Sequence, residues 1–336
     1  MQTIRNNTVD IIRGFAMLMV VLQHTIAGCT VDFANTTLFR ALWSLQMPLF
    51  FIISGYVTRY GHPLDSTKSL KKYIWKKTIA YLFPWLVWSA LIRGTIFGNY
   101  YFLNPKYLLW HMDSGYWFLF SLWWLVIING IADYFSNLLK INNRFWRISA
   151  HLLFTIIGAS ILAVVGVYLG IEFLAIKLTL FYFPLYMAGF LWGQIQDRVI
   201  SINEHYYQFV VALSLFIWLF IILRVGFFGE EMSAGVLALR YIASIAGCII
   251  VISVCHYYND KLGFFRKAGI YSLQIYLLHY LFLCPLKIGT SILPIFASSD
   301  GATDVLFNYS ITLGFVALSI VLIRKNKILT KLLFWK

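Results

Sequence analysis

The chain has 336 residues, of which 60% are hydrophobic and only 12% are charged, and its formal net charge is +14. A soluble domain carries about 25% charged residues, so this composition excludes an ordinary soluble globular fold. Apolar runs of about 20 residues, enough to cross a bilayer as one helix, recur along the whole length. The sequence therefore predicts an all-α, polytopic membrane protein whose residues 1–336 form one integral-membrane domain.

Ten apolar segments follow one another along the chain. They lie near residues 9–28, 42–59, 78–98, 115–131, 149–169, 174–195, 207–226, 236–257, 270–289 and 305–324. Most of the 27 basic residues fall in alternate connections and acidic residues predominate in the others, as the positive-inside rule requires of ten spans. We therefore expect a bundle of about ten transmembrane helices with both termini in the cytoplasm. Membrane topology accounts for the basic net charge, so no nucleic-acid partner is expected.

The first segment, VDIIRGFAMLMVVLQH at residues 9–24, combines three ionisable side chains with an apolar background. In a helix, His24 follows Arg13 by three turns plus about 20°, so the two residues share one face about 16 Å apart. Asp10 lies one turn before Arg13, close enough to pair with it. Ionisable groups at membrane depth normally face a bundle interior or a wet cavity.

Two interpretations of these residues stay open. In one, Asp10 and Arg13 form an ion pair that extends to the cytoplasmic headgroups, and His24 makes a structural hydrogen bond across helices. In the other, the three line a reaction cavity, where a histidine with an ordinary pKa near 6.5 accepts a proton from a hydroxyl. Residues 26–29 also resemble a lipoprotein cleavage site, but Gln23 and His24 interrupt the apolar stretch before them, so we expect an uncleaved helix.

Later segments place further polar and aromatic residues in the membrane. Ser54 and Gly55 mark either close helix packing or a nucleophile. Trp117 is by default an interfacial aromatic residue. His279 lies midway along the ninth segment, with Tyr276 nearly one turn before it, and it either makes a structural hydrogen bond across helices or borders the same cavity as His24.

Five stretches, in order along residues 9–282, resemble the acyltransferase-3 family of bacterial membrane O-acyltransferases that modify glycans. The pattern D-x-x-R-G-x-A, with a histidine eleven residues after the arginine, resembles the opening helix of that family. The other four stretches are QMPLFFIISGYV (46–57), YWFLF (116–120), FPLYMAGFLWG (183–193) and AGIYSLQIYLLHYLF (268–282).

The resemblance implies a multi-pass protein of the bacterial plasma (inner) membrane. It implies transfer of an acyl group, usually acetyl, from cytoplasmic acyl-CoA to a hydroxyl of a cell-surface or lipid-linked glycan. The arginine and histidine of the family correspond to Arg13 and His24, so Arg13 would orient the donor, and His24 would act as the base or carry the acyl group itself. Asp10 joins them as a catalytic candidate.

The substrate cavity would then be bordered by residues from three of the matching stretches, with Trp117 stacking on a sugar ring. These residues are Ser54, Trp117, Tyr276 and His279. Acyl-CoA, in the first place acetyl-CoA, is expected as a co-substrate, and no permanently bound cofactor is expected. The four cysteines lack metal-type spacing, so no metal site is predicted.

The phosphates of coenzyme A require a basic, cytoplasmic site. The run SLKKYIWKK offers Lys72, Lys76 and Lys77, although attraction to anionic lipid explains these lysines equally well. Members of the family often place an R-x-x-R pair here, whereas this chain reads KKTIAYLFP, with Ala80 and Tyr81 near the expected second arginine. Lysine does not reproduce the bidentate grip of a guanidinium on phosphate, so the chain departs from the family at the donor site.

A transporter or flippase for a lipid-linked sugar is the alternative function, with the buried charges binding substrate or relaying protons. Transporters often contain paired broken helices in two repeats, and no internal repeat is visible in this sequence. Three arginines toward the predicted outer side, Arg93, Arg224 and Arg240, either extend to headgroups or bind an anionic or glycan acceptor. A sensory or scaffold protein is disfavoured by the ordered series of motifs.

Overall fold

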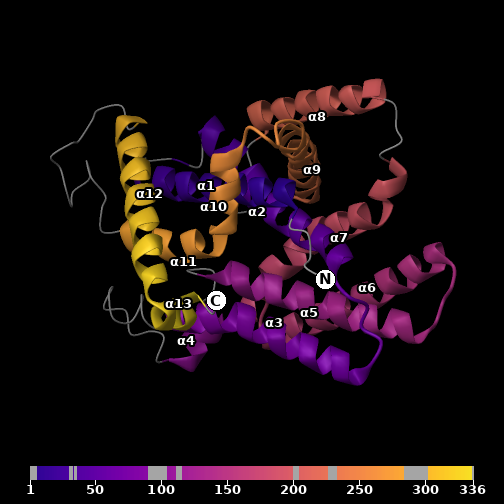
Figure 1. Ribbon diagram of the computed structural model, residues 1–336. Helices are drawn as coiled ribbons and strands as arrows, with labels where there is room; N and C mark the ends of the chain where they lie inside the picture. Colours follow the sequence, from indigo (N-terminus) through magenta and orange to yellow (C-terminus); the bar gives the residue numbers. More distant parts are fainter. Residues whose placement is uncertain are drawn as a thin grey trace. The chain divides into compact units, whose positions relative to one another are not determined.

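A computed structural model describes residues 6–29, 33, 36–89, 104–110, 116–199, 204–225, 233–283 and 302–334. Throughout these residues the regular secondary structure is helical, which confirms the predicted all-α class (Figure 1). Contacts divide the chain into two compact units, Met1–Tyr56 with Ala188–Lys325, and Val57–Met187 with Asn326–Lys336. The single domain expected over residues 1–336 stays a prediction.

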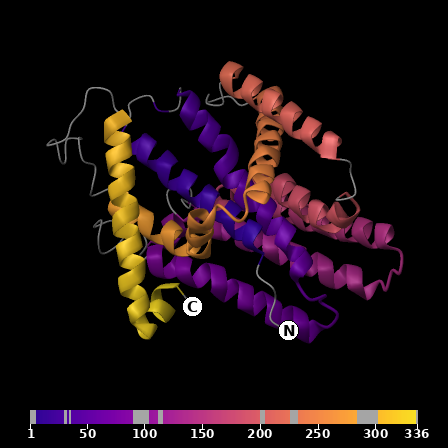
Figure 2. The same cartoon turned by 45° about the horizontal axis from the view of Figure 1, so that its top comes forward.

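The first unit is built around α1, which contacts α2, α9, α10, α11 and α12. Figures 1 and 2 show α11 next to both α1 and α12. The helices of this unit are α1 (Asn7–Cys29), α2 (Thr37–Tyr56), the second half of α7 (Ile176–Val199), α8 (Glu204–Arg224), α9 (Ala234–Tyr257), α10 (Gly263–Ile270), α11 (Ser272–Leu283) and α12 (Ala302–Lys325).

Glycines allow two very close helix crossings in the first unit. A Cβ added to Gly14 of α1 would overlap the carbonyl oxygen of Phe265 in α10, and one added to Gly269 would overlap the carbonyl oxygen of Asp10. Gly189 of α7 meets the carbonyl of Ile52 in α2 in the same way. Small residues let helix backbones approach in a membrane, where packing replaces the hydrophobic effect as the driving force. The α1–α10 crossing fixes the end of α1 that carries Asp10.

Pro48 lies inside α2, where a proline removes the N–H that would bond the carbonyl four residues earlier. That earlier residue is Ser44, whose hydroxyl donates to the Ala41 carbonyl at 2.8 Å and accepts the indole N–H of Trp218 at 3.0 Å. The Ser44 hydroxyl thus connects α2 to α8 one turn before the proline.

The second unit contains the lysine-rich helix α3. Its elements are η2 (Val57–Tyr60), α3 (Thr67–Trp88), α4 (Pro105–Trp110), α5 (Trp117–Leu138), α6 (Arg144–Leu169), η6 (Phe173–Ala175), the first half of α7 and α13 (Lys327–Phe334). Ser66 begins α3 as a capping-box residue with Ser69. Gly130 of α5 leaves room for the ring of Tyr73 in α3.

Indole N–H groups tie the helices of the second unit together. Trp123 donates to the Thr78 hydroxyl at 3.0 Å, and Trp88 donates to the Leu333 carbonyl of α13 at 2.7 Å. The ring of Trp88 also stacks on Phe334, with centroids 6.0 Å apart. The short helix α13 is therefore held against α3 by a hydrogen bond and a ring contact.

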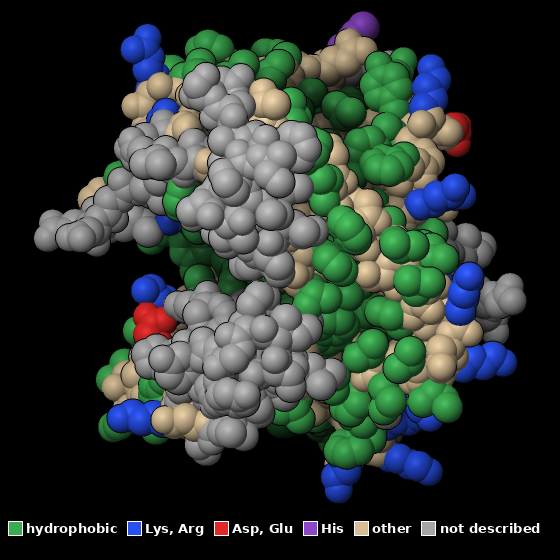
Figure 3. Space-filling model, turned by 90° about the vertical axis from the view of Figure 1, so that its left-hand side faces the viewer, with side chains coloured by type: hydrophobic (Ala, Val, Ile, Leu, Met, Phe, Trp, Pro, Cys, Tyr) green, Lys and Arg blue, Asp and Glu red, His purple; other side chains and the backbone are tan. Residues whose placement is uncertain are grey.

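Eight of the described helical segments are long and apolar enough to cross a membrane, and they coincide with eight of the ten predicted segments. The segment 78–98 begins within α3 and continues outside the described residues, and the segment 270–289 coincides with α11 as far as Leu283. Three of the eight, α6, α8 and α12, bury less than a quarter of their most apolar stretch. Figure 3 shows hydrophobic side chains over most of the described surface in its view. The protein is thus a polytopic helical membrane protein, while the count of ten spans and the cytoplasmic termini stay predictions.

Candidate functional site

The three ionisable residues predicted on the first segment lie on one uninterrupted helix, α1. The spacing of Arg13 and His24 on this helix corresponds to a rise of about 16 Å. Asp10 is 2% exposed, so its carboxyl group faces the helices of its unit and not the headgroups. Arg13 and His24 are partly exposed. The expected Asp10–Arg13 ion pair stays a prediction.

Two aromatic side chains of α11 surround the ring of His24. The Tyr280 hydroxyl lies 3.1 Å from Nε2 and 3.2 Å from Nδ1 of His24. The ring centroids are 4.8 Å apart for His24 and Tyr280, and 5.4 Å apart for His24 and His279. A contact between α1 and α11 therefore gathers two imidazoles and a phenol in one place.

His279 is completely buried and its ring is held by the backbone of its own helix. Its Nδ1 lies 2.7 Å from the Tyr276 carbonyl oxygen and 3.1 Å from that of Ile275. A carbonyl oxygen only accepts, so Nδ1 carries the proton, and in the neutral ring the lone pair lies on Nε2. Among the described residues, Nε2 of His279 has no hydrogen-bond partner. The structure thus brings His24 and His279 together and leaves Nε2 of His279 as an acceptor nitrogen near His24. A shared cavity for the two residues stays a prediction.

Tyr280 was missed by the sequence prediction. Tyr276 was predicted instead, because helical spacing places it on nearly the same face as His279. Its ring lies 6.0 Å from that of His279. Tyr280 follows His279 directly and so projects about 100° away on the helix. Only the placement of α11 against α1 brings its hydroxyl to His24, and the sequence contains no signal for that placement.

The family model that matches the chain describes an acyltransferase domain, and the match extends over residues 6–324. The chain belongs to the acyltransferase-3 family. The match includes α1 to α12 and therefore both groups of helices that carry the predicted site residues.

Two curated proteins resemble this acyltransferase-3 chain over part of its length. The nodulation protein NolL of Sinorhizobium fredii is 26% identical over 211 residues, which are 60% of this chain and 52% of that protein. An amino-acid racemase of Enterococcus faecalis is 29% identical over 99 residues, which are 27% of this chain and 14% of that protein. The chain thus spans about half of the first relative and much less of the second. No solved structure matches it.

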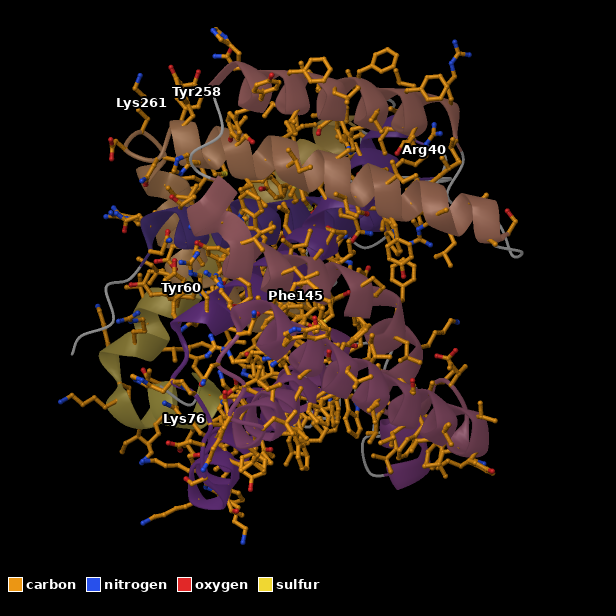
Figure 4. The ribbon with its side chains drawn as sticks, turned by 90° about the vertical axis from the view of Figure 1, so that its right-hand side faces the viewer. Arg40, Tyr60, Lys76, Phe145, Tyr258 and Lys261 are labelled. Carbon is orange, nitrogen blue, oxygen red and sulfur yellow. The ribbon has the colours of Figure 1, made fainter. Side chains whose placement is uncertain are left out.

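The lysines predicted to hold the donor of this acyltransferase-3 chain lie on α3 in the second unit. Lys72 and Lys76 are exposed and lie four residues apart, so they share one helical face. Figure 4 shows Lys76 on α3. Lys77 is partly buried, with its ammonium group 5.5 Å from the centroid of the Tyr73 ring. Lys72 and Lys76 are therefore open to a ligand or to lipid headgroups, whereas Lys77 already makes a cation–π contact.

Two other predicted cavity residues have different surroundings. Trp117 stacks on Tyr182, with centroids 5.7 Å apart and planes at 15°. Ser54 is partly exposed on α2, two residues after Ile52, whose carbonyl meets Gly189. This stretch of α2 thus takes part in close helix packing, and roles for Ser54 and Trp117 in the cavity stay predictions.

Of the three arginines expected toward the outer side, Arg93 lies outside the described residues. Arg224 is exposed at the end of α8, and Arg240 is partly exposed on α9. Arg40 of α2 was not predicted, and its Nη1 donates to the Val225 carbonyl at 3.2 Å (Figure 4). A cation is favoured there because the carbonyl end of a helix carries partial negative charge.

Proposed function

We propose that this protein is a membrane acyltransferase that moves an acyl group, in the first place acetyl, from cytoplasmic acyl-CoA to a hydroxyl of a cell-surface or lipid-linked glycan. Membership of a family described by an acyltransferase domain supports the reaction class. The observation that carries the proposal is the contact of His24 with Tyr280 and His279 in the interior of the first unit. A histidine whose ring contacts a hydrogen-bonding neighbour suits a catalytic base that is oriented by a second group.

An alcohol attacks a thioester slowly until a base removes its proton. In the proposed reaction His24 takes the proton of the acceptor hydroxyl while that oxygen bonds to the thioester carbonyl carbon. The carbon–sulfur bond then breaks, and His24 returns the proton to the coenzyme A thiolate. Atoms and charge balance without any further reactant. In a two-step variant of this mechanism, His24 itself carries the acyl group. That variant predicts that a labelled acyl group becomes attached to the protein when no acceptor is present.

Two basic groups have proposed roles at the donor. Arg13 keeps its charge at all physiological pH values and orients the donor or offsets its negative charge. Lys72 and Lys76 share an exposed face on α3 and would contact the phosphates of coenzyme A as point charges. Asp10, buried one turn before Arg13, would hold the guanidinium in place. The glycan acceptor and the bacterial inner membrane are inferred from the family resemblance.

The two similar proteins differ in how far they support this proposal. NolL matches over 60% of this chain, which supports the assignment of the chain to its family. The match to the racemase covers 14% of that protein, too small a share to support racemisation here.

The deciding experiment uses the full chain in lipid nanodiscs, with radiolabelled acetyl-CoA and a panel of lipid-linked and free glycans. We expect His24→Ala to lower transfer by at least about 100-fold, the usual contribution of a general base. His62→Ala, which removes an exposed histidine in a loop, is the matched control and keeps full activity. If His24→Ala transferred acyl groups as fast as the unmodified protein, the proposed role of His24 as the base would be wrong. Movement of the glycan across the bilayer without acyl-CoA would favour the transporter.

A further inference from the structure

Tyr280 brings its hydroxyl within hydrogen-bond distance of both ring nitrogens of His24. Its oxygen is nearly equidistant from them, at 3.1 and 3.2 Å. The N–H and the lone pair of a neutral imidazole point away from each other in the ring plane, and a phenol hydroxyl both donates and accepts. A small rotation of the His24 ring therefore decides whether the Tyr280 hydroxyl donates to the unprotonated nitrogen or accepts from the protonated one.

The ring of Tyr280 contacts the ring of His279, whose orientation is fixed. His279 lies next to it, with centroids 4.5 Å apart, and the Nδ1–H of His279 donates to the Tyr276 carbonyl at 2.7 Å. His279 is fully buried, so its ring cannot turn without leaving its Nδ1–H unpaired away from water. The backbone of α11 thus restrains the direction from which Tyr280 approaches His24.

We propose that Tyr280 is the positioning residue for His24. Its hydroxyl holds the imidazole plane so that a ring nitrogen meets the acceptor hydroxyl at each turnover, which is the role of the third group wherever a catalytic base is oriented by a neighbour. The proposal rests on the proposed acyltransferase function, because it assigns Tyr280 a part in that reaction. It also makes a claim about the His24 ring that does not depend on turnover.

Tyr280→Phe tests the proposal, because it removes one oxygen and keeps the ring and its packing. We expect kcat to fall by about 10- to 100-fold, the usual effect of a small misplacement of a catalytic group. The KM values for acetyl-CoA and acceptor should stay within about threefold, since ground-state binding is unchanged. A residue that binds substrate would instead raise KM, and that outcome would overturn the positioning role.

Tyr309→Phe is the matched control. The Tyr309 hydroxyl donates to the Leu18 carbonyl of the same helix α1 at 3.3 Å, so this variant also removes a tyrosine hydroxyl bonded to α1, but away from the His24 ring. Its kcat should stay within about twofold of the unmodified protein. Thermal unfolding of both variants shows whether each one folds.

A second measurement reports on the His24 ring directly. Diethyl pyrocarbonate acylates an imidazole lone pair, and the modification of His24 can be followed by peptide mass spectrometry in the full chain in nanodiscs. We expect His24 to react at least about threefold faster in Tyr280→Phe, because a lone pair loses its hydroxyl partner, and at an unchanged rate in Tyr309→Phe.

The two measurements separate the two proposals. If the unmodified protein transfers no acyl group to any acceptor tested but the reactivity of His24 rises in Tyr280→Phe, the positioning contact holds and the proposed function fails. If transfer depends on His24 but Tyr280→Phe keeps both its kcat and its His24 reactivity, the function holds and the positioning role is wrong.

Discussion

At the scale of single residues, two buried amide side chains pair across helices of the first unit. Gln23 precedes His24 on α1, and its side-chain oxygen accepts a hydrogen bond from the Gln46 amide of α2 at 3.3 Å. Both side chains are about 95% buried. The pair therefore holds α2 against the part of α1 that carries the candidate base.

Removing one member of this pair leaves the other amide buried without its partner. We expect Gln46→Leu to lower the free energy of unfolding by about 1–2 kcal/mol, and Gln23→Leu by a similar amount. The double variant should lose less than the sum, since neither amide is then left without its partner. Unfolding in mixed detergent micelles measures all three variants, and strictly additive losses would show that the two amides do not interact.

At the scale of elements, the α1–α10 crossing depends on two glycines. Alanine at Gly14 would place a methyl group on the Phe265 carbonyl, and backbone atoms cannot move aside as a flexible side chain would. We expect Gly14→Ala and Gly269→Ala each to cost about 3 kcal/mol or more, which is large for a single methyl group. Yield and unfolding temperature in detergent measure the effect.

Gly314→Ala is the control for both variants. Gly314 lies in α12 of the same unit, and a Cβ there would have no other atom within 4 Å. Replacing it should be neutral or stabilise the helix by about 0.5–1 kcal/mol. If Gly14→Ala behaved like Gly314→Ala, the close crossing of α1 and α10 would be wrong.

The docking of α13 on α3 predicts a change in protease sensitivity. Trp88→Ala removes both the hydrogen bond to Leu333 and the stacking on Phe334. We expect trypsin to cut at Lys327 and Lys331 at least about fivefold faster, because cleavage requires local release of the helix. Trp75→Ala removes a tryptophan that is 68% exposed on the same helix, and it should leave the cleavage rate unchanged.

The sequence predicted the helices well because long apolar runs in lipid have almost no alternative to helix. It placed the boundaries of α3 poorly. The third apolar segment was predicted to begin near residue 78, with the lysine run just before it, whereas α3 is one helix from Thr67 to Trp88. Lysines fit into a helix wherever their ammonium groups reach water. A run of lysines therefore indicates where the chain leaves the membrane, and it does not indicate where a helix begins.

Only those residues of the candidate site that belong to a recognisable motif could be predicted from the sequence. His24 and His279 were found from stretches similar to the family, and the structure brings their rings within 5.4 Å. Tyr280 and the Gln23–Gln46 pair depend on how α11 and α2 rotate against α1. That rotation is decided by contacts such as those at Gly14 and Gly269, whose partners cannot be read from a single sequence.

At the scale of the whole molecule, the distribution of charged residues predicts which connections between helices lie on each side of the membrane. In a cysteine-free background, Lys72→Cys should react with a membrane-impermeant maleimide only from the cytoplasmic side, and Glu172→Cys only from the outside. Loss of the exposed Glu172–Lys177 ion pair, at 3.1 Å, costs little. Labelling of both positions from the same side would contradict the ten-span topology.

The crossing at Gly14 and Gly269 has a consequence for how the surroundings of His24 can change. Since no side chain lies between the two backbones there, their separation cannot be adjusted by choosing a different rotamer. Only Tyr271 separates α10 from α11, so the position of α11 beside α1 depends on a spacing set by main-chain atoms. A relative with different side chains around this histidine would therefore have to change α2 or α12, and leave the α1–α10 pair as it is.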